Sequence, residues 1–247
     1  MIDNSSESLF ELKNVSYQIN GNQILKNLSF RIFSSGITGI LGPSGSGKST
    51  LLHLFNKLIS PTQGRIFYQN EDIATISSRN LRKSIGLVQQ SPFLFPGTVL
   101  ENIKYGPKIW GEQFDEKKVE SLLNTVGLPK SFINKDINQL SGGEQARVNF
   151  IRTLANNPKV LLLDEPTSSL DVTTEKMIEK SLRDLSKRGI SILIVTHSLE
   201  QAKLITDQVI ILKEGRLGQK ITTNAFFQEY DSDTIRKMFS REEEEDQ

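Results

Sequence analysis

A lysine and two hydroxyl residues end a glycine-rich stretch in a pattern suited to binding a triphosphate. Residues 42–50 (GPSGSGKST) fit the pattern Gly, four residues, Gly-Lys-Ser. Glycines permit backbone conformations in which successive N–H groups point at phosphate oxygens. Lys48 is then expected to reach the β- and γ-phosphates, and the Ser49 hydroxyl to hold Mg²⁺. The positions predicted to bind the nucleotide here are Gly42, Pro43, Ser44, Gly45, Ser46, Gly47, Lys48, Ser49 and Thr50.

Two adjacent carboxylates follow the apolar run at residues 161–163. Adjacent side chains at a strand end face different ways, so one can face a metal ion while the next faces the attacking water. Asp164 is expected to complete the Mg²⁺ shell begun by Ser49, and Glu165 to polarise or deprotonate the water that attacks the γ-phosphate. An acidic pair can also merely mark the solvent end of a strand. The preceding phosphate loop favours the chemical role.

Residues 140–144 (LSGGE) predict a second helix start suited to an anion. Ser141 and Glu144 form a capping-box pattern, which explains those two residues. It does not explain Gly142 and Gly143, each of which costs a helix about 1 kcal/mol. One nucleotide in one phosphate loop needs no second anion site. Two copies of the protein would need it if each covered the other's nucleotide.

Apolar strands and helical patterns alternate around these motifs, which predicts an α/β fold with a mostly parallel sheet flanked by helices. Ligands of such sheets bind at the carboxyl ends of the strands, where the phosphate loop and the acidic pair both fall. The expected strands are 37–41, 85–88, 160–163, 190–195 and 209–213, and the expected helices begin near 50, 141, 173 and 199.

Other segments indicate additions to this core. Alternating residues at 9–18 and 25–33 predict an antiparallel hairpin, and 65–68 a further short strand. Prolines and a helical period after residue 92 predict an inserted helical subdomain, at about 92–156. We therefore expect an ATPase domain over 8–218. Residues 219–247 are expected to form a helical extension that ends in the acidic tail 241–247.

Composition narrows the class of protein. The chain has 247 residues, with 30 Lys and Arg against 29 Asp and Glu, so its net charge of +1 supplies no field that would attract nucleic acid. It has no cysteine, which suits a reducing cytosol. The first residues lack a basic and apolar signal pattern, and no stretch reaches the roughly eighteen apolar residues that span a bilayer. We expect no nucleic-acid partner and no direct membrane insertion.

From about residue 9 to 213, the chain resembles the ATP-binding subunits of ABC (ATP-binding cassette) transporters, whose core is a P-loop NTPase. Residues 42–50 match the family's first phosphate motif, 140–144 its signature motif and 160–165 its second acidic motif. The signature ends in Glu144, where glutamine is commoner. That position varies in the family and is not expected to contact phosphate.

The resemblance also implies roles for single residues. Asp171, in the sequence Ser-Leu-Asp, matches the loop that crosses between subunits and is expected to contribute to nucleotide binding. His197 matches the switch histidine. Gln90 matches the glutamine of the loop to the helical subdomain, chosen over Gln89 because it lies two residues before a proline. Tyr17 matches the aromatic residue that stacks on adenine.

By the same resemblance, two subunits form a homodimer on ATP binding, closed head to tail around two MgATP. Each ATP lies between the phosphate loop of one chain and Ser141, Gly142 and Gly143 of the other. Glu165 serves as base, and His197 and Lys48 stabilise charge on the γ-phosphate. The Mg²⁺ ligands are Ser49, Gln90 and Asp164. The subunit is expected to be cytoplasmic, peripheral on the inner face of the cell membrane through an integral membrane permease.

Several alternatives concern cargo and class. Residues 126–152 resemble ATPase subunits of small bacterial metal or iron export systems, whereas 97–108 resemble phosphate-import ATPases. We expect metal or iron export, with phosphate import as the alternative. A non-transport ABC ATPase acting on DNA or the ribosome is disfavoured by the short link between Gln90 and Leu140, by the single cassette and by the neutral charge balance. A phosphate-loop kinase would have no use for residues 140–144.

Overall fold

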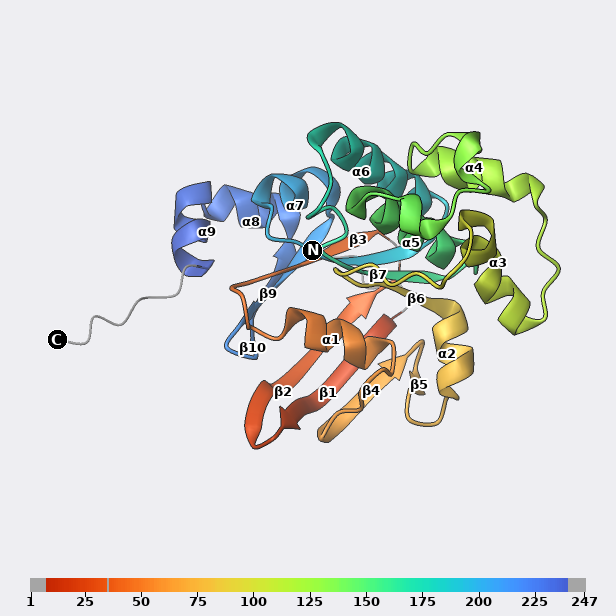
Figure 1. The fold of residues 1–247 in the computed structure, drawn as a ribbon. Coiled ribbons are helices and arrows are strands. Elements are labelled where there is room, and N and C mark those ends of the chain that lie inside the picture. Colours follow the sequence, from red (N-terminus) through yellow and green to blue (C-terminus); the bar gives the residue numbers. More distant parts are fainter. Residues whose placement is uncertain (1–7, 35, 240–247) are drawn as a thin grey trace. The chain divides into compact units, whose positions relative to one another are not determined.

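The computed structural model describes residues 8–34 and 36–239 (Figure 1). The chain divides into two compact units: unit 1 comprises residues 1–81 and 193–247, and unit 2 comprises residues 82–192. The predicted acidic tail, residues 241–247, lies outside the described residues.

Unit 1 contains an antiparallel sheet with the strand order β2-β1-β4-β5. Its strands are β1 (Ser8–Ile19), β2 (Asn22–Phe33), β4 (Gln63–Tyr68) and β5 (Glu71–Asp72). The predicted hairpin is present, with its two-residue turn at Asn20 and Gly21, whose φ angles of 49° and 80° suit a tight hairpin turn.

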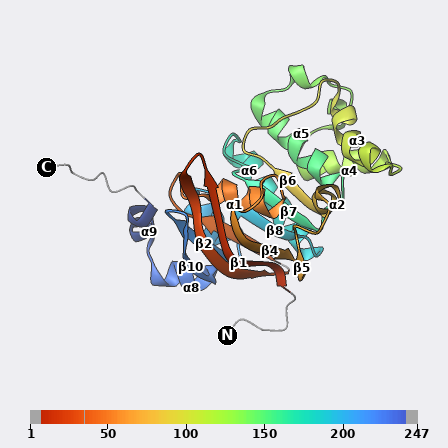
Figure 2. The same ribbon diagram turned by 90° about the horizontal axis from the view of Figure 1, so that it is seen from below.

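The helix after the phosphate loop packs on this sheet. It is α1 (Lys48–Phe55), and it follows β3 (Ile37–Leu41), a strand whose residues are all buried. Phe55 of α1 lies with its ring centroid 4.3 Å from that of Phe10 on β1, and Phe10 in turn lies 5.4 Å from Tyr68 on β4. This aromatic contact fixes α1 against the sheet, beside β1 and β2 (Figure 2).

The rest of unit 1, which supports the phosphate loop, comes from the C-terminal part of the chain. β3 pairs in parallel with β9 (Gln208–Lys213), and β9 pairs antiparallel with β10 (Arg216–Thr222). The helices of this part are α7 (Leu199–Ile205), α8 (Thr223–Glu229) and α9 (Ser232–Phe239). The sequence did not predict β10, because Gly218 and the polar residues beside it hide the strand alternation.

Unit 2 holds the parallel pair β6 (Ile85–Val88) and β7 (Val160–Asp164) and most of the helices after residue 92. The helices are α3 (Val99–Trp110), α4 (Lys117–Thr125), η1 (Lys130–Phe132), η2 (Ile137–Gln139), α5 (Gly142–Leu154) and α6 (Val172–Lys187). Two elements cross the division between the units, namely α2 (Ser78–Ser84) and β8 (Ser191–Val195).

The alternation of strand and helix confirms the α/β fold class with its antiparallel β addition. Parallel pairing is present in both units, and every residue of β7 and β8 is buried, as expected of strands covered on both faces. Over the described residues, no helix combines the length and the apolar character that crossing a bilayer requires.

Candidate nucleotide-binding site

The phosphate loop lies between β3 and α1, as its pattern predicts. Two of its glycines cannot carry a side chain. Gly42 has φ 148°, and a Cβ there would lie 2.0 Å from the carbonyl oxygen of Leu212. Gly47 has φ 99°, and a Cβ there would lie 2.6 Å from Leu25 Cδ2. The loop backbone is therefore pressed against β2 and β9, which holds its N–H groups in one arrangement.

Lys48 is held inside the loop rather than extended into solvent. Its side chain is buried, with 5% of the residue exposed. Its Nζ donates hydrogen bonds to the carbonyl oxygens of Gly42 and Pro43, at 2.9 and 2.8 Å. In this position, the Lys48 ammonium can donate hydrogen bonds to anionic oxygens that bind over the loop. The neighbouring positions Ser44, Gly45 and Ser49 are exposed, and Thr50 is half-buried.

The turn between β9 and β10 braces the loop, a support that sequence reasoning missed. The Gly215 N–H donates to the Ser46 carbonyl oxygen at 3.2 Å, and the Gly215 carbonyl accepts from the Lys26 N–H at 2.7 Å. Gly215 thus links the phosphate loop to β2. The available signal was the Glu-Gly-Arg turn at residues 214–216, but its partner lies far away in the sequence.

The other predicted residues of unit 1 are Tyr17 and His197. Tyr17 is half-buried on β1, opposite Leu25 of β2, the residue whose side chain closes over Gly47. His197 is exposed in the loop between β8 and α7, at the rim of a hollow of about 420 Å³. The assignments of adenine stacking to Tyr17 and of phosphate sensing to His197 stay predictions.

Unit 2 brings Gln90 and Glu165 together. The Gln90 Nε2 donates to Glu165 Oε2 at 3.0 Å. Glu165 follows β7 with φ 47°, a left-handed conformation that costs a non-glycine residue roughly 1 kcal/mol or more. Its carbonyl oxygen accepts from the backbone N–H and the hydroxyl of Ser168, which holds this turn. The strained backbone therefore fixes the position of the Glu165 carboxylate at the end of β7.

The carboxylate of Asp164 is suited to binding a cation. It is 6% exposed, and its Oδ1 is buried without a hydrogen-bond partner among the described residues. A buried carboxylate oxygen left in this way fits coordination to a hard cation such as Mg²⁺. The described residues contain no group of three or more His, Asp or Glu side chains that could hold a metal ion by themselves.

The helix start at residues 141–144 has the predicted capping box. The Ser141 Oγ accepts from the Glu144 N–H at 3.3 Å, and the Ser141 N–H donates to Glu144 Oε2 at 2.7 Å. The Ser141 N–H, with smaller contributions from Lys135 and Arg147, holds the pKa of Glu144 below its ordinary value. A Cβ at Gly142 would meet no described atom within 4 Å, and one at Gly143 would make only ordinary contacts with Ser169 and Leu170.

Asp171 caps α6 and uses both carboxylate oxygens within its own helix. Its Oδ1 accepts from the N–H groups of Thr173 and Thr174 at 3.0 Å, and its Oδ2 accepts from the Thr174 hydroxyl at 2.7 Å. The Thr174 hydroxyl is the largest cause of the lowered pKa of Asp171. These bonds account for an aspartate here without a nucleotide, so its predicted nucleotide contact stays a prediction.

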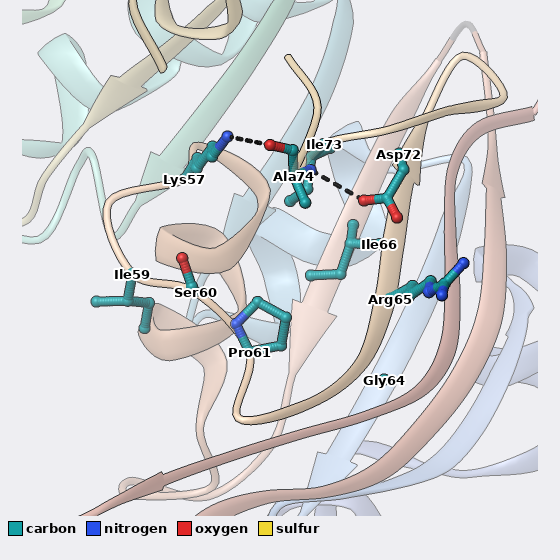
Figure 3. Close-up of a pocket in the computed structure, with 10 residues that line it drawn as sticks. All are labelled: Lys57, Ile59, Ser60, Pro61, Gly64, Arg65, Ile66, Asp72, Ile73 and Ala74. Carbon is teal, nitrogen blue, oxygen red and sulfur yellow. Dashed lines mark hydrogen bonds between the residues drawn. The ribbon is translucent and has the colours of Figure 1, made fainter. Parts of the chain in front are cut away.

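A second hollow, of about 610 Å³, lies between the end of α1 and the strands β4 and β5 in unit 1 (Figure 3). Lys57 Nζ donates to the Ala74 carbonyl at 3.0 Å, and the Asp72 carboxylate accepts from the Ala74 N–H at 2.9 Å. These bonds join the turn after β5 to the end of α1. None of the predicted site residues lines this hollow.

Comparisons with known proteins agree with the motifs. Residues 25–168 match the sequence family described as ABC transporter. ABC transporter I family member 17 of Arabidopsis thaliana is 42% identical over 198 residues, covering 80% of this chain and 75% of that protein. The phosphate import ATP-binding protein PstB of Saccharolobus solfataricus is 40% identical over 236 residues, covering 90% of this chain and 91% of that protein.

A solved structure extends the similarity to the fold. It is described as a dimeric, post-hydrolysis state of the ATP-binding cassette MJ0796 bound to ADP and Pi. It superimposes with a TM-score of 0.78 at 34% sequence identity, over 87% of this chain and 98% of that one.

Proposed function

Because this chain belongs to the ABC transporter family, as an ATP-binding subunit that hydrolyses ATP, we propose that two copies close head to tail around two MgATP and drive a membrane permease. The observation that carries the proposal is the phosphate loop. Its backbone is pressed against β2 and β9, and Lys48 is folded back over its carbonyl oxygens. Such a preformed cradle offers N–H donors and an ammonium to phosphate oxygens without a cost of reorganisation.

Glu165 is the proposed base for the attacking water. Its carboxylate is half-buried, and its backbone is fixed by a left-handed turn and by the Ser168 contacts. Gln90 donates to that carboxylate, so the side chain is oriented before any substrate arrives. A base held at one place adds both proximity and proton transfer to the reaction. Lys48 and His197 are proposed to stabilise the charge on the γ-phosphate.

Ser49, Gln90 and Asp164 would hold the Mg²⁺ that accompanies ATP. The buried, unpartnered Oδ1 of Asp164 supports this assignment, since it has no described protein partner that explains it. When bound, Mg²⁺ offsets negative charge on the β- and γ-phosphate oxygens. The protein residues then need only orient the phosphates and the water.

The glycine pair at the start of α5 supports the head-to-tail arrangement. Gly142 and Gly143 weaken the start of α5 by about 1 kcal/mol each, yet the described part of the chain has nothing that would crowd a side chain at Gly142. We attribute the choice of glycine to a ligand outside the described residues. In the proposed dimer, that ligand is a triphosphate presented by a second copy, close to Ser141 and the first N–H groups of α5.

We propose that the subunit acts at the cytoplasmic face of the membrane, where it is attached through the permease. Two cargoes are candidates. Export of a metal ion such as iron follows from the resemblance of residues 126–152. Phosphate import is favoured by the relative from Saccharolobus solfataricus, which is named as a phosphate import protein.

The substitution Glu165→Gln tests the catalytic proposal. The amide keeps the shape of the side chain but cannot accept the proton, so turnover should fall by a hundredfold or more, on the scale of about 10²–10⁴ for a lost general base. ATP binding should persist, and a closed dimer should accumulate with ATP and Mg²⁺, seen by size-exclusion chromatography with light scattering. Glu120→Gln, which removes a charge from the exposed face of α4, is the matched control. Wild-type turnover in Glu165→Gln would refute the role of Glu165.

The same variant identifies the partner and then the cargo. Tagged Glu165→Gln is expressed with its native membranes, solubilised with MgATP and purified with whatever remains bound. A multi-spanning protein supports the transporter role, whereas ribosomes or DNA alone would point to the non-transport class. The wild-type complex in liposomes is then assayed for ATP-dependent movement of Fe²⁺ and of inorganic phosphate, each in both directions. Outward Fe²⁺ movement supports export, and inward phosphate movement supports import.

A further inference from the structure

The last described helix, α9, forms one wall of the hollow that His197 borders. The residues around this hollow are His197, Ser198, Leu199, Glu200, Ser232, Arg236 and Phe239. The first four belong to the loop and the start of α7, and the last three belong to α9. Helices α7, α8 and α9 lie beside one another in unit 1 (Figure 1). The C-terminal extension therefore borders the loop that carries a proposed catalytic residue.

The His197 loop is tied to α7 by short-range hydrogen bonds. The Ser198 N–H donates to the Thr196 hydroxyl at 3.0 Å, and the Ser198 hydroxyl accepts from the Gln201 N–H at 3.1 Å. Thr196 is itself buried, with 5% exposed. The first bond joins the two neighbours of His197, and the second joins Ser198 to α7, so a displacement of α7 is expected to move the histidine.

The position of α7 depends on packing, because a helix of seven residues is too short to be stable by itself. Ala202 of α7 lies in a hydrophobic cluster with Leu41, Val209, Phe226 and Ile235, and the partly buried Leu199 and Phe239 pack against the same cluster. At the far end of α7, the hydroxyls of Thr206 and Thr223 lie 2.7 Å apart, which joins α7 to α8.

Ile235 is the residue that anchors α9 in this cluster. It is 0% exposed, and it is the only residue of α9 classed as buried in the described chain. Other residues of the helix are less buried: Phe239 packs against the cluster but is only partly buried, and Met238 is 37% exposed. The ion pair between Arg236 and Asp233 lies at the surface, where such pairs contribute little. Without the Ile235 side chain, α9 loses its one fully buried anchor among the described residues.

We propose that Ile235 is a positioning residue for His197: by holding α9 against α7, it sets where the histidine stands during ATP hydrolysis. This inference rests on the proposed role of His197. Ile235 shares one hydrophobic cluster with Ala202 of α7, Leu199 packs against that cluster, and the capped start of α7 leads to His197. A displacement of about 1 Å at a catalytic group can cost on the order of a hundredfold in rate.

The cluster offers one competing route, because Leu41 directly precedes the phosphate loop. An effect passed through Leu41 would disturb the loop and weaken nucleotide binding. An effect passed through α7 would leave binding intact and lower only the rate of hydrolysis. The two routes therefore differ in their split between kcat and nucleotide affinity.

The test compares Ile235→Ala with Met238→Ala, which removes an exposed side chain from the same helix. Both full-length variants are assayed for kcat and KM of ATP hydrolysis and for the affinity of a non-hydrolysable ATP analogue. We expect kcat of Ile235→Ala to fall by roughly 5- to 50-fold, with analogue affinity within about twofold of wild type, since a misplaced group costs rate rather than binding. Met238→Ala should match wild type. Unchanged kcat, or a loss confined to affinity, overturns the proposal.

Ile235→Val provides the milder variant if Ile235→Ala does not fold. It removes a single methyl group, so it should retain the fold and show a smaller fall in kcat of the same kind. Ile235→Leu, which keeps the volume, should restore most of the rate. A Val variant that folds and hydrolyses ATP at the wild-type rate counts against the proposal.

Combining Ile235→Ala with His197→Ala separates positioning from general loosening. If Ile235 acts through His197, it has nothing left to position once the histidine is gone, so the double variant should hydrolyse ATP no more slowly than His197→Ala alone. Multiplicative losses would overturn the inference while leaving the proposed function intact. If His197→Ala itself turns over like wild type, the proposed role of His197 fails, and with it the premise of the inference.

Discussion

Gly47 occupies a backbone conformation and a space that a side chain cannot share. Gly47→Ala would strain a residue at φ 99° and push against Leu25 Cδ2, so either the buried Leu25 side chain or the phosphate loop must shift. We expect ATP affinity to fall by at least about tenfold, because the N–H groups lose their common direction. Nucleotide binding followed by isothermal titration checks this.

Gly189→Ala is the control for that substitution. Gly189 also has a positive φ, of 92°, but a Cβ there would meet no described atom within 4 Å. It carries the same kind of backbone strain, about 1 kcal/mol, without any crowding. Equal losses of ATP affinity in the two variants would mean that a general loss of stability, and not the geometry of the phosphate loop, explains the result.

For single residues, the sequence predicts the phosphate-binding motif better than it predicts the distant residues that hold that motif in place. The order of glycines, Lys48 and Ser49 was enough to place the loop between a strand and a helix, because each of those features acts over a few residues. The carbonyl of Leu212 beside Gly42 and the N–H of Gly215 on Ser46 could not be predicted. They come from the end of β9 and the turn after it, more than a hundred residues away, which only the folded sheet brings close.

Among the helices and strands, the capped N-terminus of α5 should make a pH-dependent contribution to stability. Hydrogen bonding from the Ser141 N–H lowers the pKa of Glu144 below its ordinary value of 4.5. A group with a lowered pKa in the folded state adds stability that is complete above 4.5 and is lost as the pH falls through the folded pKa. The free energy of unfolding should therefore decrease below this pH.

Glu144→Gln should flatten that decrease, since the amide does not titrate. Urea unfolding midpoints measured from pH 7 down to about pH 3 check this, with the control Glu120→Gln, which removes an acid that does not cap a helix. At neutral pH the loss of the charged cap should cost roughly 0.5–1 kcal/mol. A slope in Glu144→Gln as steep as that of the wild type would contradict the capping argument.

Long, strongly patterned elements could be predicted from the sequence, and short or polar ones could not. The hairpin of β1 and β2, the buried strands and α6 all follow from clear periods. The two-residue strand β5 and the helix α2 were missed because neither contains enough apolar residues to reveal a period. The strand β10 was missed because its partner β9, and not its own side chains, specifies it.

At the scale of the whole molecule, the proposed dimer assigns a role to the start of α5. Within unit 2, Gln90 and Glu165 are joined, while a Cβ at Gly142 of α5 would meet no described atom within 4 Å. In the proposed head-to-tail dimer, that helix start would bind the triphosphate held by the other copy. The nucleotide would then be part of the interface, so that ATP would stabilise association and hydrolysis would weaken it.

Subunit complementation tests this arrangement directly. Lys48→Ala removes the phosphate contact from its own chain, and Ser141→Arg blocks the helix start that its chain offers to the partner, so each variant by itself should be nearly inactive. A mixture contains heterodimers in which the intact loop of the Ser141→Arg chain faces the intact helix start of the Lys48→Ala chain. Random pairing puts one such site in half of the dimers, so mixing should restore up to roughly a quarter of wild-type turnover. If each site were built within one chain, mixing would restore nothing, because every chain would carry its own defect into every dimer.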